Sequence, residues 1–116
     1  MTALSVLTKA LYDLPASAFE NARSFHNAIE HALKKRGWTV IREFQIRNGS
    51  DGCSGYIDLV VTHPIRMALE LDRNSPRKNS VAKLSRFKGL RFVILRRGRR
   101  IIPVYETEES SQQARS

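Results

Sequence analysis

Apolar and polar positions recur along this chain with two different periods, and each change of period marks an expected element. Residues 16–37 repeat apolar side chains at three- and four-residue intervals: Ala22, Phe25, Ile29, Ala32 and Leu33. This spacing is one face of an α-helix. Ser17 followed by Glu20 matches a capping box, so we expect the helix to begin near Ser17, and Gly37 ends it. A shorter amphipathic helix over residues 3–11 precedes it.

Five later segments are rich in β-branched and aromatic residues, which predicts strands. They cover residues 38–46, 56–63, 66–72, 91–97 and 100–106. Between the third and fourth of these, residues 81–90 place Val81, Leu84 and Phe87 on one helical face, and Ser80 is positioned to cap that helix. Pro103 has no amide hydrogen, which favours a sheet edge for the last strand.

The order after the first short helix is therefore helix, three strands, helix, two strands. The first three strands are expected to form a meander, and the helix that follows supplies a crossover that makes strands three and four parallel. This predicts an α/β (α+β) fold with a mixed β-sheet flanked by helices, in a single domain over residues 1–105. Residues 106–116 are polar, and we expect them to form a disordered tail.

The net charge of the chain and its distribution indicate which class of partner the protein binds. The chain has 20 basic and 11 acidic residues, a net charge of +9. Between Arg66 and Arg100 there are 12 basic residues and only two acids, Glu70 and Asp72. Such a field attracts polyanions, and phosphate backbones are the usual ones, so we expect a nucleic-acid partner rather than merely a well-solvated surface. The RRGRR segment, with Arg97 and Arg99, is expected to contact phosphates.

The number of cysteines and the lengths of the apolar runs indicate the expected cellular location. Cys53 is the only cysteine, so no disulfide can form within the chain, which fits a reducing, cytoplasmic setting. No apolar run approaches the ~18–20 residues that span a bilayer, so we expect no membrane contact.

Three acids are placed on two strands that are expected to be neighbours. Side chains alternate faces along a strand, so Glu70 and Asp72 project the same way, about 6–7 Å apart. On the preceding strand, the pattern puts Ile57 and Leu59 on one face and Asp58 on the other. If the two strands form a hairpin, Asp58 joins the other two acids.

Three carboxylates on one patch repel one another unless cations lie among them. Mg²⁺ suits such a patch, because it takes hard oxygen ligands and keeps positions for water and phosphate oxygens; Mn²⁺ would substitute for it. The alternative is purely structural: Asp58 is exposed, and the other two acids pair with Arg73, Arg77 or Lys78.

The segments GYIDLVV and RMALELD, taken with this order of elements, resemble the core of the PD-(D/E)XK nuclease superfamily. The resemblance covers residues 17–105 and implies the restriction-endonuclease-like αβββαβ core. IEHALKKRGWTVIREF is similar to the first core helix and strand of small members such as the archaeal-type Holliday-junction resolvases, with Glu30 in the position of their helix glutamate. A solvated Glu30 paired with Lys34 is the alternative for that residue.

The resemblance implies a Mg²⁺-dependent DNA endonuclease. Asp58 and Glu70 would be metal ligands, and Glu30 an outer or additional one. The third motif position should be lysine, but Asp72 occupies it, either as a further metal ligand or as a general base. The missing lysine could instead come from Lys78 or Lys83.

These residues are compatible with three functions. The first is a metal-dependent endonuclease acting on duplex, branched or single-stranded DNA, with Arg73, Arg77, Lys78 and Lys83 binding phosphate. Sequence-specific recognition of a duplex by so short a chain would call for a homodimer or another partner. The second is a degenerate nuclease-like module that binds nucleic acid without cutting it, favoured by Asp72. The third is a small basic interaction subunit.

Overall fold

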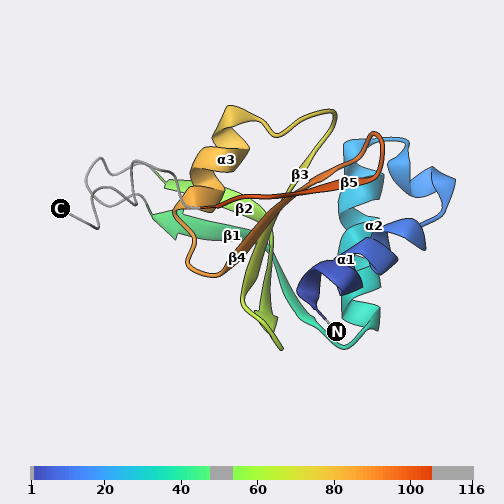
Figure 1. Cartoon of the computed structure of the whole chain (residues 1–116), viewed down its shortest axis with the longest axis horizontal. Helices are drawn as coiled ribbons and strands as arrows, with labels where there is room; N and C mark the ends of the chain where they lie inside the picture. The colour runs from blue at the N-terminus through green and yellow to red at the C-terminus, as the bar shows by residue number, and fades with distance from the viewer. Residues whose placement is uncertain (1, 48–53, 106–116) are drawn as a thin grey trace.

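A computed structural model describes residues 2–47 and 54–105 of the chain. Figure 1 shows its elements, in order: α1 (Ala3–Tyr12), a 3₁₀ turn (Ala16–Phe19), α2 (Ala22–Lys35), β1 (Thr39–Arg47), β2 (Ser54–His63), β3 (Met67–Asp72), α3 (Lys78–Ser85), β4 (Leu90–Leu95) and β5 (Arg100–Pro103). The expected disorder of residues 106–116 and the inferences from Cys53 fall outside the described residues.

The five strands form one mixed sheet in the order β1-β2-β3-β4-β5. The β1-β2 and β2-β3 pairs are antiparallel, β3-β4 is parallel and β4-β5 is antiparallel. This confirms the meander and the helical crossover that the sequence predicted. Pro103 lies in β5, which is an edge strand, as expected. The protein is therefore of the mixed α/β class, with a five-stranded sheet and three α-helices in the described part of the chain.

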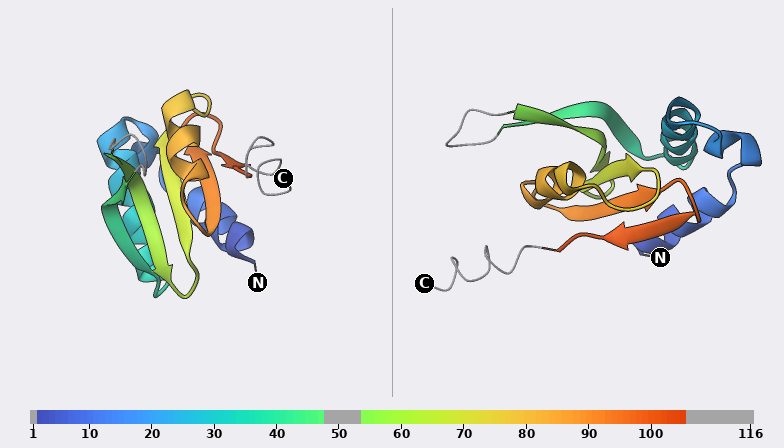
Figure 2. Two further views of the ribbon diagram at one scale, coloured as in Figure 1. Left: turned by 90° about the vertical axis from the view of Figure 1, so that its left-hand side faces the viewer. Right: turned by 90° about the horizontal axis from the view of Figure 1, so that it is seen from above.

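Helices cover both faces of the sheet. On one face, α1 and α2 bury Leu7, Leu11, Phe25 and Leu33 against alternate strand residues such as Leu69. The opposite face packs against α3 and the turn after it, with these buried residues: Ile46, Ile57, Val60, Ala68, Leu84, Phe87, Val93 and Leu95. Figure 2 shows the far ends of β1 and β2 extending alongside α3, away from α1 and α2. Each helical layer therefore meets a different end of the β1-β2 hairpin.

The predicted beginning of the second helix at Ser17 is wrong. Residues 16–19 form the 3₁₀ turn, and α2 begins at Ala22. Asn21 is the N-cap: its backbone is extended, and its side-chain oxygen accepts the Ser24 N–H at 2.9 Å. Asparagine is among the best N-cap residues, which explains why it takes this role.

The predicted cap of the third helix is also wrong. α3 begins at Lys78, and Ser80 lies buried within its first turn. Arg77 occupies the N-cap position without a side-chain capping bond. The hydrogen-bond acceptor at this end of the helix belongs to β3. The Asp72 carboxylate accepts hydrogen bonds from the Arg77 N–H and from the Ser80 hydroxyl, both at 2.9 Å. A tertiary contact therefore replaces the local cap.

The expectation that Ile57 and Leu59 share a face fails as well. Ile57 packs on the α3 side of the sheet, whereas Leu59 packs on the α1-α2 side. The paired strand changes face in the same region, because Val40 belongs to the α1-α2 side and Ile46 to the α3 side. Between them, Glu43 has a φ of +52°, a left-handed conformation that interrupts the regular pleat.

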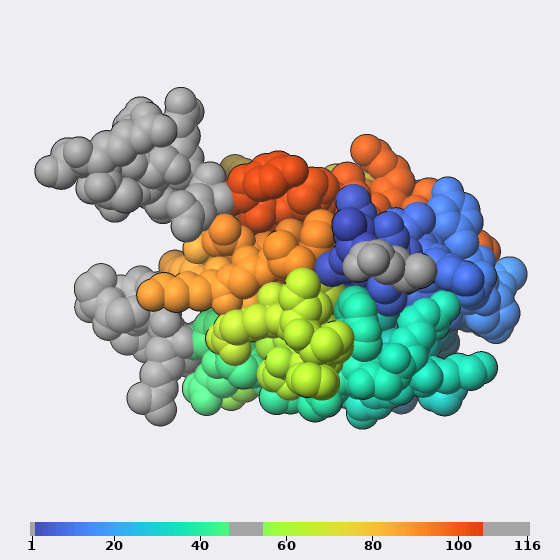
Figure 3. Space-filling model, turned by 60° about the horizontal axis from the view of Figure 1, so that its bottom comes forward, coloured from blue at the N-terminus to red at the C-terminus, as the bar shows by residue number. Residues whose placement is uncertain are grey.

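The turn between β4 and β5 is anchored to the N-terminal elements. Arg99 places its guanidinium carbon 4.3 Å from the centre of the Phe19 ring and donates to the Tyr12 carbonyl at 3.3 Å. In Figure 3, α1 (dark blue) lies at the surface near the C-terminal strands (orange to red). Among residues 2–47 and 54–105, no helix is both long and apolar enough to cross a membrane.

Candidate active site at the fork between β2 and β3

β2 and β3 diverge at the point where two of the predicted acids face each other. The strands pair only at Leu59–Val61 with Met67–Leu69. If this register continued, the next pair would be Asp58 and Glu70. The β2-β3 pairing ends there instead, and β2 remains paired with β1 while β3 remains paired with β4. The two strands therefore form a fork, with one carboxylate on each branch.

The two carboxylates bridge the fork by accepting main-chain hydrogen bonds. Glu70 Oε2 accepts the N–H of Asp58 at 2.7 Å. Asp58 Oδ2 accepts the N–H of Leu71 at 2.8 Å. These bonds satisfy amide groups that the interrupted ladder leaves without a carbonyl partner. The hairpin prediction that Asp58 would lie beside Glu70 is therefore consistent with this geometry.

Glu70 is fully buried, with no exposed surface. Lys83 Nζ lies 2.6 Å from Glu70 Oε1 and also donates to the Tyr56 carbonyl at 2.9 Å. Oε1 accepts no hydrogen bond of good angular geometry, so the contact with Lys83 is an ion pair rather than an aligned hydrogen bond. One oxygen of the buried acid thus lacks the aligned donor that its counterpart has.

Burial raises the pKa of Glu70, and the negative charge of Asp58 raises it further. The close contact and positive charge of Lys83, together with the hydrogen bond from the Asp58 N–H, lower the pKa of Glu70. Lys83 therefore favours the ionised form of an acid that its surroundings would otherwise keep protonated.

The Lys83 side chain passes close to Gly55 on its way to this acid. A Cβ at Gly55 would lie 3.3 Å from Lys83 Cδ, closer than ordinary van der Waals contact. The lysine side chain crosses from α3 to the β2 branch of the fork along this gap. Of the two lysines suggested by the sequence, Lys83 is thus beside the acids, whereas Lys78 is exposed in the first turn of α3.

Asp72 forms hydrogen bonds with different partners from those of Asp58 and Glu70. Its Oδ1 accepts the Nε of Arg77 and the hydroxyl of Ser80, and its Oδ2 accepts the Arg77 N–H, all at 2.9 Å. The side chain is fully buried. The hydrogen bond that Arg77 donates to the Asp72 carboxylate raises the pKa of Arg77 above its ordinary value. Asp72 therefore holds the beginning of α3 against the end of β3.

A pocket of about 350 Å³ opens beside the fork. Its polar lining comes from β2, α2 and the segments after β3 and β4: His26, Asp58, Asp72, Arg73, Arg77 and Arg96. His26 Nε2 lies 3.8 Å from Asp58 Oδ2. Three arginines therefore face a cavity that also exposes the Asp58 carboxylate.

Neither Arg96 nor His26 was predicted to lie beside the acids, although the RRGRR segment that begins with Arg96 was expected to contact phosphates. The position of Arg96 could have been predicted from the parallel pairing of β3 and β4, in which Asp72 is opposite Leu95. The residues that follow each strand, Arg73 and Arg96, must then emerge at the same edge. His26 had no comparable signal, because its position depends on how α2 is rotated on the sheet.

The other predicted site residues lie outside the pocket lining. Glu30 pairs with Lys34 at 2.7 Å, as in the alternative for that residue, and its Oε1 lies 3.3 Å from Arg42 Nε. Arg97 is exposed and lies 3.5 Å from the side-chain oxygen of Asn74. Arg99 is occupied by its contacts with Phe19 and Tyr12, which leaves it a structural role.

Within the described ranges, 2–47 and 54–105, no three His, Cys, Asp or Glu side chains are grouped so as to hold a metal ion. A two-carboxylate site is a different case, because Mg²⁺ commonly takes only one or two protein carboxylates and completes its shell with water and phosphate. Asp58 and Glu70 match that number of ligands, because they face each other across the fork and Asp58 lines the pocket. A metal ion at Glu70 would have to share the carboxylate with Lys83, whose Nζ lies 2.6 Å from Oε1. Asp72 fits poorly, because three donors already occupy its oxygens.

No family model matches the chain, and comparisons with curated proteins and with solved structures give no significant match.

Proposed function

We propose that this protein is a divalent-metal-dependent endonuclease of the PD-(D/E)XK type that hydrolyses phosphodiester bonds in DNA. The observation that carries the proposal is the juxtaposition at the fork. Asp58 and Glu70 come from neighbouring strands, and the ammonium group of Lys83 lies 2.6 Å from Glu70. The order of the core elements, helix, three strands, helix, strand, is the one that the resemblance requires.

The two fork carboxylates would hold Mg²⁺ or Mn²⁺. When bound, such an ion polarises the phosphodiester and lowers the pKa of an attacking water. Lys83 takes the place of the lysine that the motif lacks at Asp72, because it is the lysine paired with Glu70. Its positive charge limits the repulsion between the two acids and is available to orient a water or a phosphate oxygen.

The arginines of the pocket would bind the substrate backbone. Arg77 is suited to this, because Asp72 fixes its Nε while most of its side chain remains exposed. Arg73 and Arg96 line the same cavity from the ends of two parallel strands. A planar guanidinium can bind two phosphate oxygens at once, so this cluster would position the strand over Asp58.

A second function, binding without cleavage, is favoured by one specific observation. Glu70 is already neutralised by Lys83, and Asp72 by Arg77. A metal ion at Glu70 would have to compete with the ammonium group. If it cannot, the arginine-lined pocket would bind phosphate while the acids serve only to hold the fork.

One experiment separates the two functions. Wild-type protein is incubated with linear, supercoiled, single-stranded and branched DNA in Mg²⁺, Mn²⁺ or EDTA. The endonuclease predicts products that require the metal and that disappear in Asp58→Asn. Glu20→Gln is the matched control, because Glu20 is an exposed carboxylate far from the fork in the chain. Binding to the same DNAs is followed by fluorescence anisotropy over a salt series.

The results have clear consequences. Metal-dependent products from wild type and Glu20→Gln but not Asp58→Asn support the endonuclease. Salt-sensitive binding without products in any metal supports the binding module instead. Absence of both cleavage and binding at low salt contradicts both functions. A homodimer, which would present two such sites to a duplex, predicts a sedimentation mass twice that of the chain.

A further inference from the structure

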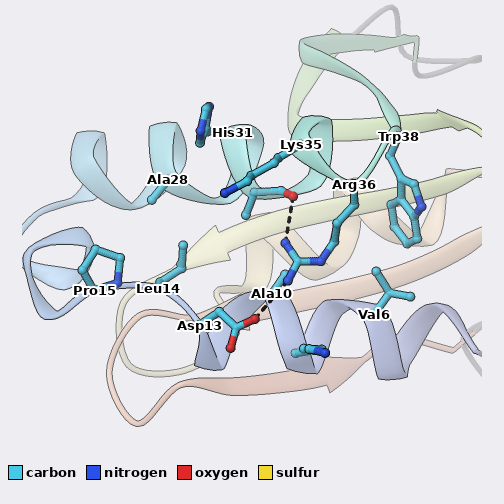
Figure 4. Close-up of a pocket in the computed structure, with 12 residues that line it drawn as sticks. Val6, Ala10, Asp13, Leu14, Pro15, Ala28, His31, Lys35, Arg36 and Trp38 are labelled. Atoms are coloured by element: carbon cyan, nitrogen blue, oxygen red, sulfur yellow. Dashed lines mark hydrogen bonds and ion pairs between the residues drawn. The ribbon is translucent and has the colours of Figure 1, made fainter.

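A groove of about 810 Å³ lies between α1 and α2. It shares no lining residue with the arginine-lined pocket. Figure 4 shows the two helices on either side of it, with Trp38 at one end and Leu14 and Pro15 at the other. α2 therefore presents one face to the proposed active site and another to this groove.

Small apolar side chains account for the space. Ala10 on α1 and Ala28 and Ala32 on α2 line the groove, so the facing helices have little side-chain volume with which to fill it. Val6 and Leu14 add branched aliphatic surface at its sides. The result is a hydrophobic channel flanked by two helices, the geometry that commonly accepts the apolar face of a third helix.

The rim of the groove is basic. Lys9 from α1 and His31 and Lys35 from α2 are exposed around it. The one acid of the lining, Asp13, is bonded to Arg36 at 3.1 Å. Among the described residues, neither Lys9 nor Lys35 forms an ion pair within the chain. No acid of residues 2–47 and 54–105 therefore neutralises these two lysines.

We propose that this groove docks an acidic amphipathic helix of a partner protein. Its hydrophobic floor would take the apolar face of the helix, and the rim lysines would pair with acidic residues that flank that face. Single-stranded nucleic acid fits the groove less well. Successive bases need a series of aromatic platforms, and Trp38 is the only aromatic side chain in the lining besides the imidazole of His31.

The test uses Trp38, the only tryptophan of the chain, as a fluorescence reporter. The probe is a synthetic peptide with leucine at i, i+3, i+4 and i+7 and glutamate at most other positions. Two further peptides serve as controls: one of the same composition in scrambled order, and one with lysine in place of glutamate. We expect only the acidic amphipathic peptide to shift Trp38 emission to shorter wavelength in a saturable way.

Charge reversal then locates the site. We expect Lys9→Glu/Lys35→Glu to weaken binding of the acidic peptide about tenfold, an effect of roughly 1.4 kcal/mol. Arg86→Glu/Lys88→Glu is the matched control, because it changes net charge equally at exposed residues at and beyond the end of α3. We expect it to change the affinity by less than about threefold.

Several outcomes would overturn the proposal. These are an unchanged Trp38 emission, equal affinity for the scrambled peptide, or equal losses in the two double variants. Displacement of the peptide by a single-stranded oligonucleotide, with the loss confined to Lys9→Glu/Lys35→Glu, would assign the groove to nucleic acid. None of these measurements requires a metal ion or cleavage, so the docking proposal stands or fails independently of the nuclease.

Discussion

Asp58 and Glu70 stabilise each other's strand across the fork between β2 and β3. The Asp58 N–H donates to the Glu70 carboxylate, and the Asp58 carboxylate accepts the N–H of Leu71, the residue that follows Glu70. The acids proposed to bind a metal therefore also end the β2-β3 ladder. Substitutions at these positions must separate a structural loss from a chemical one.

The first prediction makes that separation at Asp58. Asp58→Ala removes the acceptor of the Leu71 N–H, so we expect the free energy of unfolding to fall by about 1–3 kcal/mol. Asp58→Asn keeps an acceptor oxygen and should cost less. Both should lose metal-dependent cleavage. Urea unfolding and the cleavage assay measure the two effects, and wild-type cleavage by Asp58→Asn would contradict the proposed ligand role.

The second prediction concerns the ion pair of Lys83 with Glu70. Lys83→Met leaves a buried carboxylate without its cation, and we expect a loss of up to about 3 kcal/mol of unfolding free energy. In a Glu70→Gln background the same substitution should cost less than about 1 kcal/mol, because no buried charge remains. Lys78→Met, at an exposed position, should change stability by less than about 0.5 kcal/mol. Equal costs in both backgrounds would mean that the pair has no energetic coupling.

The third prediction is a pH dependence. Burial raises the pKa of Glu70 above its ordinary value of 4.5. The folded protein then binds this proton more tightly than the unfolded chain does. Glu70 therefore contributes stability below pH 4.5, and this contribution is lost as the pH rises through the raised pKa.

Wild type and Glu70→Gln are compared by urea unfolding over a series of pH values to test this sign. We expect the unfolding free energy of wild type, relative to Glu70→Gln, to decrease as the pH rises from below 4.5 toward neutrality. Carboxylates that do not interact with Glu70 titrate alike in both proteins and cancel in the difference. A difference that grows with pH would mean that the Lys83 pair outweighs burial.

The fourth prediction tests how Asp72 holds α3. Asp72→Ala leaves the Arg77 N–H and the buried Ser80 hydroxyl without their acceptor, and we expect at least about 2 kcal/mol of destabilisation. The loss should appear first as faster amide hydrogen exchange in α3. Ser80→Ala, which removes one of these bonds, should have a smaller effect. Unchanged exchange in α3 would argue against this anchoring role.

The fifth prediction compares two glycines with positive φ. Gly89 has φ +146°, and a Cβ there would lie 2.8 Å from both the Arg66 carbonyl and the Phe87 ring. Gly37 has φ +86°, but a Cβ would meet nothing within 4 Å. We expect Gly89→Ala to cost at least about 2 kcal/mol, because a backbone contact cannot move aside, and Gly37→Ala about 1 kcal/mol. Thermal or urea unfolding measures both.

Much of the fold follows from local sequence patterns. Apolar spacing and residue type located α1, α2, α3 and β1 to β5, though not the 3₁₀ turn, and the helix between the third and fourth strands predicted a parallel crossover after a meander. The same logic placed Asp58 next to Glu70, because adjacent antiparallel strands bring facing positions together. These features depend on interactions between near neighbours in the chain or across one short turn.

The helix boundaries at Ser17 and Ser80 were less predictable. Several residues near each end could act as caps, and the choice depends on where the chain turns before the helix. Asn21 caps α2 because a 3₁₀ turn comes first, and Asp72 takes over at α3 because the end of β3 lies beside it. When several nearby residues are similarly good caps, tertiary packing decides which of them ends the helix.

The contacts of several charged side chains depended on the tertiary structure. Lys83 reaches Glu70 and Tyr56 because α3 docks on the sheet through Leu84, and Tyr56 lies 27 residues away in the chain. The positions of His26 and Arg99 likewise depend on how distant elements are rotated on the sheet. The sequence by itself determined which residues share a helix face, because the helical period is local, but it did not determine the faces of β1 and β2, where the regular alternation is interrupted near Glu43. Only the folded sheet decided which of those faces meet, because twist and helix rotation arise from packing of the whole core.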